Sequence, residues 1–179
     1  ALGVSSSVGL YKACEVVRGF QKAGIEVRVV MTPNATKLIS PLLFSTLAGT
    51  KTIVDLFEEP ETRAIRHISL AKEISLLCVA PATANVLGKF AGGVADDFLT
   101  TLFLATRAPV LVAPAMNEAM FLHPRTQANI ARLRALGVEF VEPARGYLAC
   151  GEEGWGRLAE PEAIVREGLR ILGRAESLK

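Results

Sequence analysis

The hydrophobic and polar positions alternate along the chain between two kinds of segment. Some segments are short and almost continuously apolar, as strands covered on both faces are. Residues predicted as such strands are 1–4, 25–31, 75–80, 109–113 and, more weakly, 138–141. In others, apolar residues recur at helical spacing, as from Ala13 to Phe20, where Lys12, Glu15 and Arg18 are interspersed and Gly24 ends the pattern. The last segment, from Pro161 to about Gly173, is amphipathic in the same way.

Strands that alternate with helices predict an α/β fold with a parallel sheet and right-handed crossovers. We therefore expect a Rossmann-like, doubly wound parallel sheet in a single domain that covers residues 1–179. The chain starts without Met, and a strand is already under way at Leu2. We expect that a few residues of the first strand are missing.

Four loops follow the predicted strands, and ligands of doubly wound sheets bind beyond the carboxyl ends of strands. These loops are Ser5–Ser7, Thr32–Asn34, Pro81–Asn85 and Pro114–Asn117. The three serines before a helix could bind a phosphate with their N–H and hydroxyl groups, or they could simply cap that helix. Neither GxGxxG nor GxxxxGK[ST] occurs, so the usual NAD and ATP motifs are missing.

Several other residues have both a functional and an ordinary interpretation. His67 stands where a helix is predicted to start, and a capping or surface histidine is an adequate explanation. The pair Asp96–Asp97 indicates a helix N-cap, and Met116 and Met120 beside Asn117 could be core residues. Cys150 precedes a segment with three glycines in six positions, which predicts a mobile flap rather than a core position.

Composition narrows the classes of protein. Half of the residues are hydrophobic, 21% are charged and the net charge is +2, so nothing favours disorder, nucleic acid or a membrane as partner. No apolar run approaches the ~18 residues that a membrane helix needs. Cys14, Cys78 and Cys150 form no CxxC pair, which favours a reducing, cytoplasmic setting without a metal site. The mean hydropathy of +0.34 is high, which suggests surface buried between subunits.

Taken together, the loops resemble one family in order and spacing. The resemblance rests on four motifs, which are Pro81-Ala82-Thr83-Ala84-Asn85, Pro114-Ala115-Met116-Asn117 with Met120, the pair His67-Ile68 and the late Ala149-Cys150-Gly151. The chain resembles, over almost its whole length, the homo-oligomeric flavin-containing cysteine decarboxylases. Within them it is most similar to the branch that acts on 4'-phosphopantothenoylcysteine. The resemblance implies a flavodoxin-like sheet and FMN as cofactor.

The resemblance also implies roles for individual residues. His67 matches a catalytic histidine of the oxidative step, Cys150 matches the acid of the last step, and Asn117 matches the residue that binds the substrate carboxylate. The substrate-binding positions further include Met120, Leu148 and Ala149. The positions matched to FMN binding are Ser6, Ser7, Val8, Thr32, Ala82, Thr83, Ala84, Asn85 and Ala115. Ser6 stands where the family often has glycine, and serine fits there only if its φ is negative.

The activity implied is decarboxylation to 4'-phosphopantetheine in coenzyme A biosynthesis, through thioaldehyde and enethiolate forms of the substrate. Arg145 and Lys89 flank the loops and are candidates for the substrate phosphate. A homotrimer or a trimer-based dodecamer is expected, with a fused or separate phosphopantothenate–cysteine ligase as partner. The alternatives are a peptide cysteine decarboxylase, a flavin prenyltransferase of the same fold and a non-catalytic FMN-binding regulatory subunit.

Overall fold

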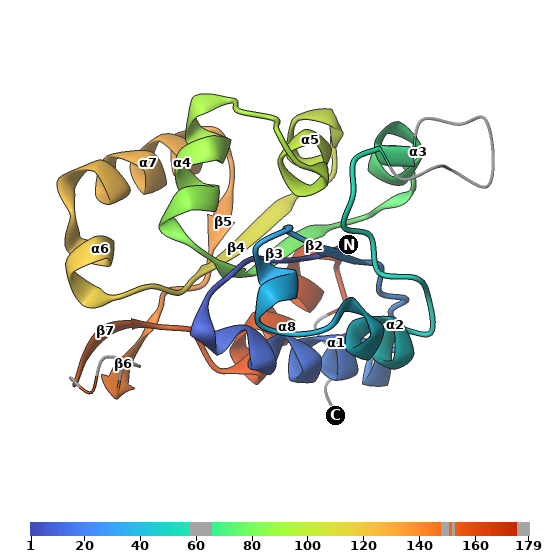
Figure 1. Cartoon of the computed structure of the whole chain (residues 1–179), viewed down its shortest axis with the longest axis horizontal. Coiled ribbons are helices and arrows are strands. Elements are labelled where there is room, and N and C mark those ends of the chain that lie inside the picture. The colour runs from blue at the N-terminus through green and yellow to red at the C-terminus, as the bar shows by residue number, and fades with distance from the viewer. Residues whose placement is uncertain (58–65, 148–150, 152, 175–179) are drawn as a thin grey trace.

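A five-stranded parallel sheet forms the centre of the protein (Figure 1). The computed structural model describes residues 1–57, 66–147, 151 and 153–174. The strands are β1 (Leu2–Val4), β2 (Val29–Met31), β3 (Leu77–Ala82), β4 (Val110–Pro114) and β5 (Glu139–Phe140). Their order across the sheet is β2-β1-β3-β4-β5, so the chain turns in opposite directions from β1. The predicted doubly wound α/β fold is confirmed.

Helices cover both faces of this sheet. Around one face lie α1 (Ala13–Lys22), α2 (Pro41–Ala48) and α8 (Pro161–Ile171), with the short 3₁₀ helix η1 (Val8–Lys12) ahead of α1. On the other face lie α3 (Arg66–Glu73), α4 (Ala84–Gly92), α5 (Phe98–Ala105) and α7 (Pro124–Ala135). None of the helices in the described part of the chain is long and apolar enough to cross a membrane.

Successive strand residues point into two separate cores, as the period of two in a strand requires. Cys78 and Leu111 pack with α1, α2 and α8, whereas their neighbours Val79 and Val112 pack with the helices of the other face. The register holds these residues in rows, because Cys78 pairs with Leu111 and Val79 with Val112. This double coverage explains why the predicted strands contain so few polar residues.

Three elements differ from the expectation. The strand predicted over 25–31 is paired only at Val29–Met31. Glu26 and Arg28 ahead of it are exposed and bond to each other at 2.8 Å. After Thr32 the chain forms a 3₁₀ turn, η2 (Ala35–Lys37), and no α-helix until α2. Part of the segment predicted as a mobile flap is the strand β7 (Glu153–Arg157), which forms an antiparallel hairpin with β6 (Ala144–Tyr147).

Candidate functional site

A cavity of about 660 Å³ opens at the carboxyl ends of the strands, where the topology predicts a ligand. This volume lies within the range of roughly 300–1,000 Å³ that is usual for cofactor and small-molecule sites. Its lining comes from η1, the loops after β1, β3 and β4, the short helix α6 (Glu118–Leu122) and the β6–β7 hairpin. The lining residues are Ser6, Ser7, Val8, Gly9, Tyr11, Lys12, Thr83, Ala84, Ala115, Met116, Asn117, Met120, Tyr147, Gly156, Arg157 and Leu158.

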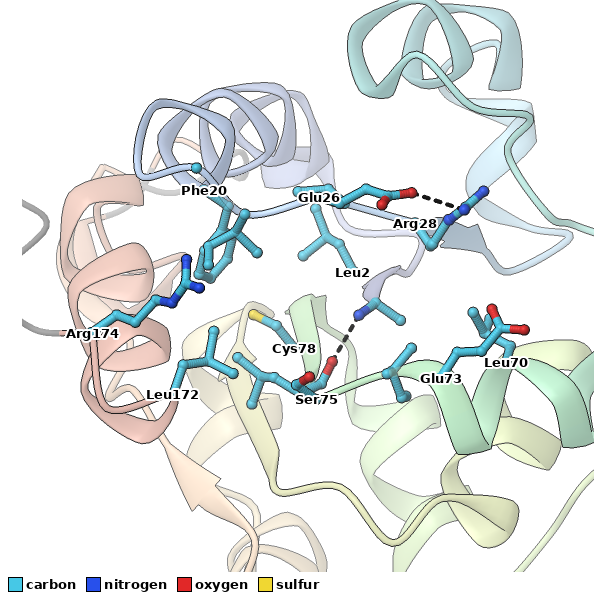
Figure 2. A pocket seen from close by; sticks show the side chains of 16 residues that line it. Leu2, Phe20, Glu26, Arg28, Leu70, Glu73, Ser75, Cys78, Leu172 and Arg174 are labelled. Carbon is cyan, nitrogen blue, oxygen red and sulfur yellow. Dashed lines mark hydrogen bonds and ion pairs between the residues drawn. The ribbon is translucent and has the colours of Figure 1, made fainter.

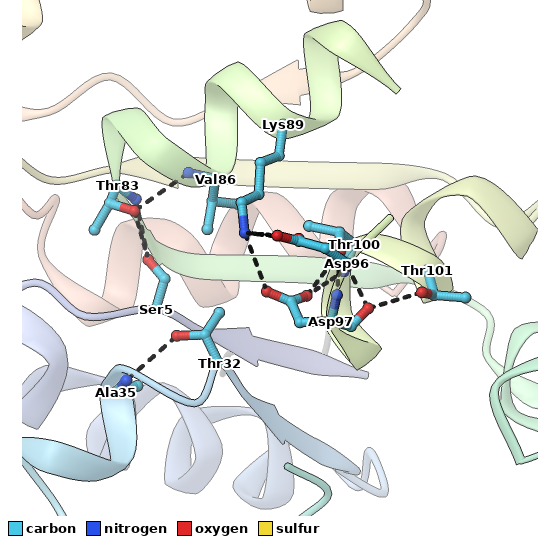
Figure 3. Close-up of polar contacts among 10 residues, drawn as sticks. All are labelled: Ser5, Thr32, Ala35, Thr83, Val86, Lys89, Asp96, Asp97, Thr100 and Thr101. Atoms are coloured by element: carbon cyan, nitrogen blue, oxygen red, sulfur yellow. Dashed lines mark hydrogen bonds and ion pairs between the residues drawn. The ribbon is translucent and has the colours of Figure 1, made fainter. Parts of the chain in front are cut away.

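Ser5 fixes the serine loop to the end of β3 (Figure 3). Its buried hydroxyl donates to the Pro81 carbonyl oxygen at 2.8 Å and accepts from the Thr83 backbone N–H at 3.0 Å. The neighbouring Ser7 stands at the N-cap of η1, but its side chain makes no capping hydrogen bond. Simple capping therefore does not account for Ser7, whose residue lines the cavity instead.

Serine fits at position 6, where the family often has glycine, because the backbone there does not have a positive φ. No non-glycine residue in the described ranges has a positive φ, so serine is unstrained at this position. Ser6 and Ser7 also precede the first turn of η1, where hydroxyl and N–H groups gather beside the cavity. This local chemistry fits a phosphate-bearing ligand such as FMN.

Some of the residues expected to bind FMN at the loops after β2 and β3 line the cavity, and others do not. Thr83 caps α4 by accepting the Val86 N–H at 3.4 Å, and both Thr83 and Ala84 line the cavity. Thr32 is buried at the end of β2, where its hydroxyl accepts the Ala35 N–H at 3.3 Å. Figure 3 shows Thr32 just past the end of β2, beside Ser5. Thr32, Ala82 and Asn85 are not among the cavity-lining residues.

Asn85 belongs to the first turn of α4 and is exposed, so the expectation that it lies in a loop is wrong. Lys89, one turn further on, is held by Asp96, whose two carboxylate oxygens lie 2.7 and 2.9 Å from its Nζ. This contact lowers the pKa of Asp96, and it leaves Lys89 less suited to bind a substrate phosphate. Of the predicted Asp96–Asp97 capping pair, only Asp97 caps a helix.

Asn117 and Met120 reach the cavity from α6. Asn117 is the N-cap of this helix, with its side-chain oxygen accepting the Ala119 N–H at 2.9 Å. Both residues line the cavity, and Met120 is 49% exposed. The structure thus brings Asn117 and Met120 to the same cavity as Ser6, Ser7 and Thr83, although they are more than thirty positions apart in sequence.

Lys12 and Arg157 are the charged residues of the lining, and sequence reasoning missed both. The Lys12 side chain is only 9% exposed, and its Nζ lies 2.7 Å from Glu160 Oε2. Arg157 bonds the other oxygen of Glu160 at 2.8 Å. The hydrogen bond from Lys12 lowers the pKa of Glu160. Two cations facing one carboxylate make this wall of the cavity positive, which suits an anionic ligand.

His67 does not line the cavity. It lies near the start of α3, half-buried, with its ring edge-on to Phe98 at a centroid distance of 6.3 Å. Figure 1 shows α3 at the far end of the molecule from β6 and β7. Leu148, Ala149 and Cys150 lie outside the described residues, so their assigned roles remain predictions.

A second cavity, of about 430 Å³, lies at the opposite edge of the sheet (Figure 2). Leu2, Phe20, Cys78 and Leu172 line it together with Arg174. This edge carries the amino ends of β1 and β3, where open α/β sheets do not bind ligands. Within the described ranges, no group of three or more His, Cys, Asp or Glu residues could hold a metal ion.

The fold and the cavity define a doubly wound α/β protein with a ligand site at the carboxyl edge of its sheet. Residues 1–172 match the family described as Flavoprotein, and the chain belongs to that family. A relative in Bacillus subtilis, the coenzyme A biosynthesis bifunctional protein CoaBC, is 48% identical over 165 residues. This alignment covers 92% of the chain and 41% of the relative. The protein of the same name in Mycobacterium tuberculosis is 41% identical, with 99% and 42% covered.

Solved structures agree with these sequence relatives. A phosphopantothenoylcysteine (PPC) decarboxylase, solved as a cysteine-to-serine mutant with pantothenoylaminoethenethiol, superposes with a TM-score of 0.83 at 30% identity. It covers 96% of each chain. The FMN-binding protein AtHal3 gives a TM-score of 0.80 at 31% identity, covering 96% of this chain and 94% of that one. The chain spans about two fifths of the length of the curated relatives it matches.

Proposed function

We propose that this chain binds FMN and decarboxylates 4'-phosphopantothenoylcysteine to 4'-phosphopantetheine in coenzyme A biosynthesis. The observation that carries the proposal is one cavity lined by Ser6, Ser7, Thr83, Asn117 and Met120, in a chain that belongs to the Flavoprotein family. The relatives named CoaBC and the likeness to a PPC decarboxylase support the same activity. FMN, when bound, supplies reversible two-electron chemistry, and the protein supplies binding, orientation and protons.

Ser6, Ser7, Val8, Thr83, Ala84 and Ala115 are the described residues that would hold FMN at the cavity. The positive wall formed by Lys12 and Arg157 supports a ligand that carries phosphate. Thr32, Ala82 and Asn85 are not among the cavity-lining residues, so the proposal that they bind FMN rests on the resemblance alone. The fit of the cavity to a phosphorylated cofactor is therefore strongest at η1 and at the start of α4.

Asn117 is proposed to bind the substrate carboxylate through its amide N–H. A neutral amide orients the carboxylate without the strong stabilisation of negative charge that an arginine would give, so CO₂ can still leave. Met120, Leu148 and Ala149 are proposed to contact the rest of the substrate. Cys150 is proposed to donate the proton that completes the saturated thiol product.

His67 is proposed to orient or deprotonate the reacting unit during the oxidative step. Since His67 does not line the cavity of its own chain, we propose that it serves the cavity of a neighbouring copy. Val8, Tyr11, Met120 and Tyr147 line this cavity and are 66%, 57%, 49% and 76% exposed, which supports burial of its mouth by another chain. A homotrimer or a trimer-based dodecamer is the assembly proposed.

A phosphopantothenate–cysteine ligase, fused or separate, is proposed as the partner that makes the substrate. The naming of the relatives as bifunctional, together with their greater length, supports this proposal. Cys14 and Cys78 are free thiols, which suits a reducing compartment such as the cytoplasm.

Two measurements on the purified protein test the proposed function. The protein should copurify with FMN and show a flavin absorbance spectrum, and it should release CO₂ from 4'-phosphopantothenoylcysteine. A peptide that ends in cysteine serves as the comparison substrate, because SpaF, an FMN-dependent cysteine decarboxylase, superposes with a TM-score of 0.82 at 29% identity. A colourless protein that cannot be reconstituted with FMN contradicts the proposal, and a preference for the peptide contradicts the proposed substrate.

A further inference from the structure

The β6–β7 hairpin forms part of the cavity wall but does not belong to the central sheet. It contributes Tyr147, Gly156 and Arg157 to the lining. An isolated two-stranded hairpin is at best marginally stable in water. Its position over the cavity must therefore be fixed by contacts outside the hairpin.

Two hydrogen bonds join β7 to the segment at the start of α6. The Met116 backbone N–H donates to the Gly156 carbonyl oxygen at 2.9 Å. The Trp155 backbone N–H donates to the Glu118 carboxylate at 2.8 Å. Without Glu118, the Trp155 N–H would face water on the free edge of a two-stranded sheet. The Glu118 side chain therefore supplies the hydrogen-bond acceptor for this N–H, and Glu118 belongs to the same segment as the cavity-lining Asn117.

The glycines on either side of Trp155 make this close approach possible. A Cβ atom on Gly154 would lie 2.8 Å from Glu118 Cδ. Gly156 has a φ of +117°, and a Cβ there would lie 2.1 Å from the Met116 carbonyl oxygen. Both contacts are shorter than real Cβ contacts. A side chain at position 156 would push β7 away from the Met116 backbone, and one at position 154 would displace the Glu118 carboxylate. The hairpin sequence is therefore matched to the position of Glu118.

We propose that Glu118 is a positioning residue that fixes the β6–β7 hairpin over the cavity. Three consecutive residues connect the hairpin to the cavity, since Met116 pairs with β7 through its backbone, Asn117 lines the cavity, and Glu118 binds the Trp155 N–H. The Glu118 bond and the Met116–Gly156 bond together hold the hairpin wall next to Asn117. The effect of Glu118 on the hairpin is independent of the reaction, whereas its effect on substrate binding rests on the proposed function.

Glu118 could instead matter only as a negative charge in the first turn of α6, where the helix dipole favours carboxylates. Two variants separate these explanations. Glu118→Gln removes the charge but keeps an oxygen that reaches the Trp155 N–H. Glu118→Asp keeps the charge but shortens the side chain by one methylene, so it no longer reaches that N–H.

Hydrogen exchange at Trp155 tests the positioning without reference to catalysis. Trp155 is the only tryptophan of the sequence, so ¹⁵N-tryptophan labelling of the whole protein with FMN gives one backbone amide signal. Glu118→Asp and Glu118→Ala should speed exchange of this amide by about tenfold, the size expected for loss of a hydrogen bond to a charged group. Glu118→Gln keeps a weaker, neutral hydrogen bond and should speed exchange by only about threefold. Glu153→Gln, an exposed carboxylate on the same strand, is the matched control and should change nothing.

Substitution of Gly154 tests the same contact from the opposite side. Gly154→Ala should displace the Glu118 carboxylate and speed exchange as Glu118→Ala does. The double variant should then exchange no faster than either single variant, because both remove one contact. Additive effects would overturn the assignment of the contact.

Steady-state CO₂ release then tests the effect on the cavity. Glu118→Asp should raise KM for 4'-phosphopantothenoylcysteine by about tenfold with a much smaller change in kcat, and Glu118→Gln should restore the wild-type KM. Exchange in Glu118→Gln that is as fast as in Glu118→Ala, or an unchanged KM in Glu118→Asp, overturns the proposal. If the wild-type protein releases no CO₂, the proposed function fails, and the exchange rates together with the FMN dissociation constants of the variants decide on Glu118 alone.

Discussion

Cys78 illustrates how far the surroundings of one residue decide its chemistry. Cys78 is 2% exposed near the start of β3, and burial raises the pKa of its thiol to about 12. Only the thiolate reacts with disulfide reagents, so Cys78 should not react in the folded protein at pH 8 but should react once guanidinium unfolds it. Cys78→Ser should lower the free energy of unfolding by about 1–3 kcal/mol, because it buries a hydroxyl.

The test of Cys78 is a thiol titration with and without guanidinium, followed by a denaturant curve of the serine variant. Cys14 is the internal control, since it is only partly buried on α1, although burial raises its pKa as well. Rapid reaction of Cys78 in the folded protein would contradict its burial in β3. Neither serine variant should change the identity of the reaction product.

Cys150 should behave differently from both. If its thiol only protonates the enethiolate after CO₂ has left, Cys150→Ser should still oxidise and decarboxylate the substrate. Serine is a far weaker acid than cysteine, so the product should be an oxidised enethiol, two mass units lighter than the normal thiol. The PPC decarboxylase that this chain resembles was captured as a cysteine-to-serine mutant with pantothenoylaminoethenethiol, which supports this expectation. Mass spectrometry of the product of Cys150→Ser tests this role. If the variant forms the normal thiol at an undiminished rate, another group donates the proton.

The sequence predicted those residues of the cavity that follow strands, because the topology fixes where strand ends meet. Ser6, Ser7, Thr83 and Asn117 are of this kind. Lys12 could not be found in this way. It reads as one of several polar residues near a helix start, and only the approach of Glu160 from a distant element shows that it is buried.

At the scale of elements, the bond between Lys12 and Glu160 joins η1 to the start of α8. The pKa of Glu160 is lowered by the hydrogen bond from Lys12, so the ionised form stabilises the folded state. This stability is fully present above the unfolded pKa of about 4.3 and is lost as the pH falls through the lower folded value. Glu160→Gln should therefore lower Tm at pH 7, and the Tm difference from wild type should shrink below about pH 4.

Melting curves between pH 3 and pH 7 measure this difference, with Glu162→Gln as the control. Glu162 lies two residues later, exposed in the first turn of α8, so the two variants remove the same charge from the same helix end. A Tm difference for Glu160→Gln that stays constant down to pH 3 would contradict the ionic character of the bond.

The sequence predicts those elements whose apolar residues recur at a regular spacing. It does not predict elements that depend on contacts with distant parts of the chain. The central strands and the helices α1 and α8 follow directly from apolar runs and helical spacing. The β6–β7 hairpin has glycine at positions 146, 154 and 156, which reads as a flexible segment. Met116 and Glu118 form hydrogen bonds with the outer edge of this strand pair. The residues around the hairpin do not predict these bonds, because both partners lie more than thirty positions away from β7 in the sequence.

At the scale of the whole molecule, one chain gathers six of the nine proposed cofactor residues and Asn117 at the cavity but leaves His67 outside it. The exposed apolar side chains at the cavity mouth and the positive mean hydropathy agree with an additional chain at this position. Sequence reasoning could assign His67 by resemblance. The sequence could not show where His67 lies relative to the cavity, because the position of α3 depends on how all the helices pack on the sheet.

An assembly in which His67 serves a neighbouring cavity predicts complementation between two inactive variants. His67→Asn removes the histidine, and Asn117→Asp sets a carboxylate against the substrate carboxylate, so each variant alone should be inactive. In mixed oligomers formed by co-expression, some cavities receive an intact His67 from one chain and an intact Asn117 from the other. Random mixing of two chains per site should restore about a quarter of the wild-type rate of CO₂ release in the whole mixture, and about a third in trimers that contain both variants.

The amount of restored activity distinguishes a shared site from a single-chain site. Co-expressed chains with different affinity tags, purified through both tags, ensure that each oligomer contains both variants. A mixture of the two separately purified variants that do not exchange subunits is the control and should stay inactive. If the doubly purified oligomers also release no CO₂ while binding FMN normally, each cavity uses the histidine and the asparagine of one chain. His67 would then have to reach Asn117 through a rearrangement of α3 within its own subunit.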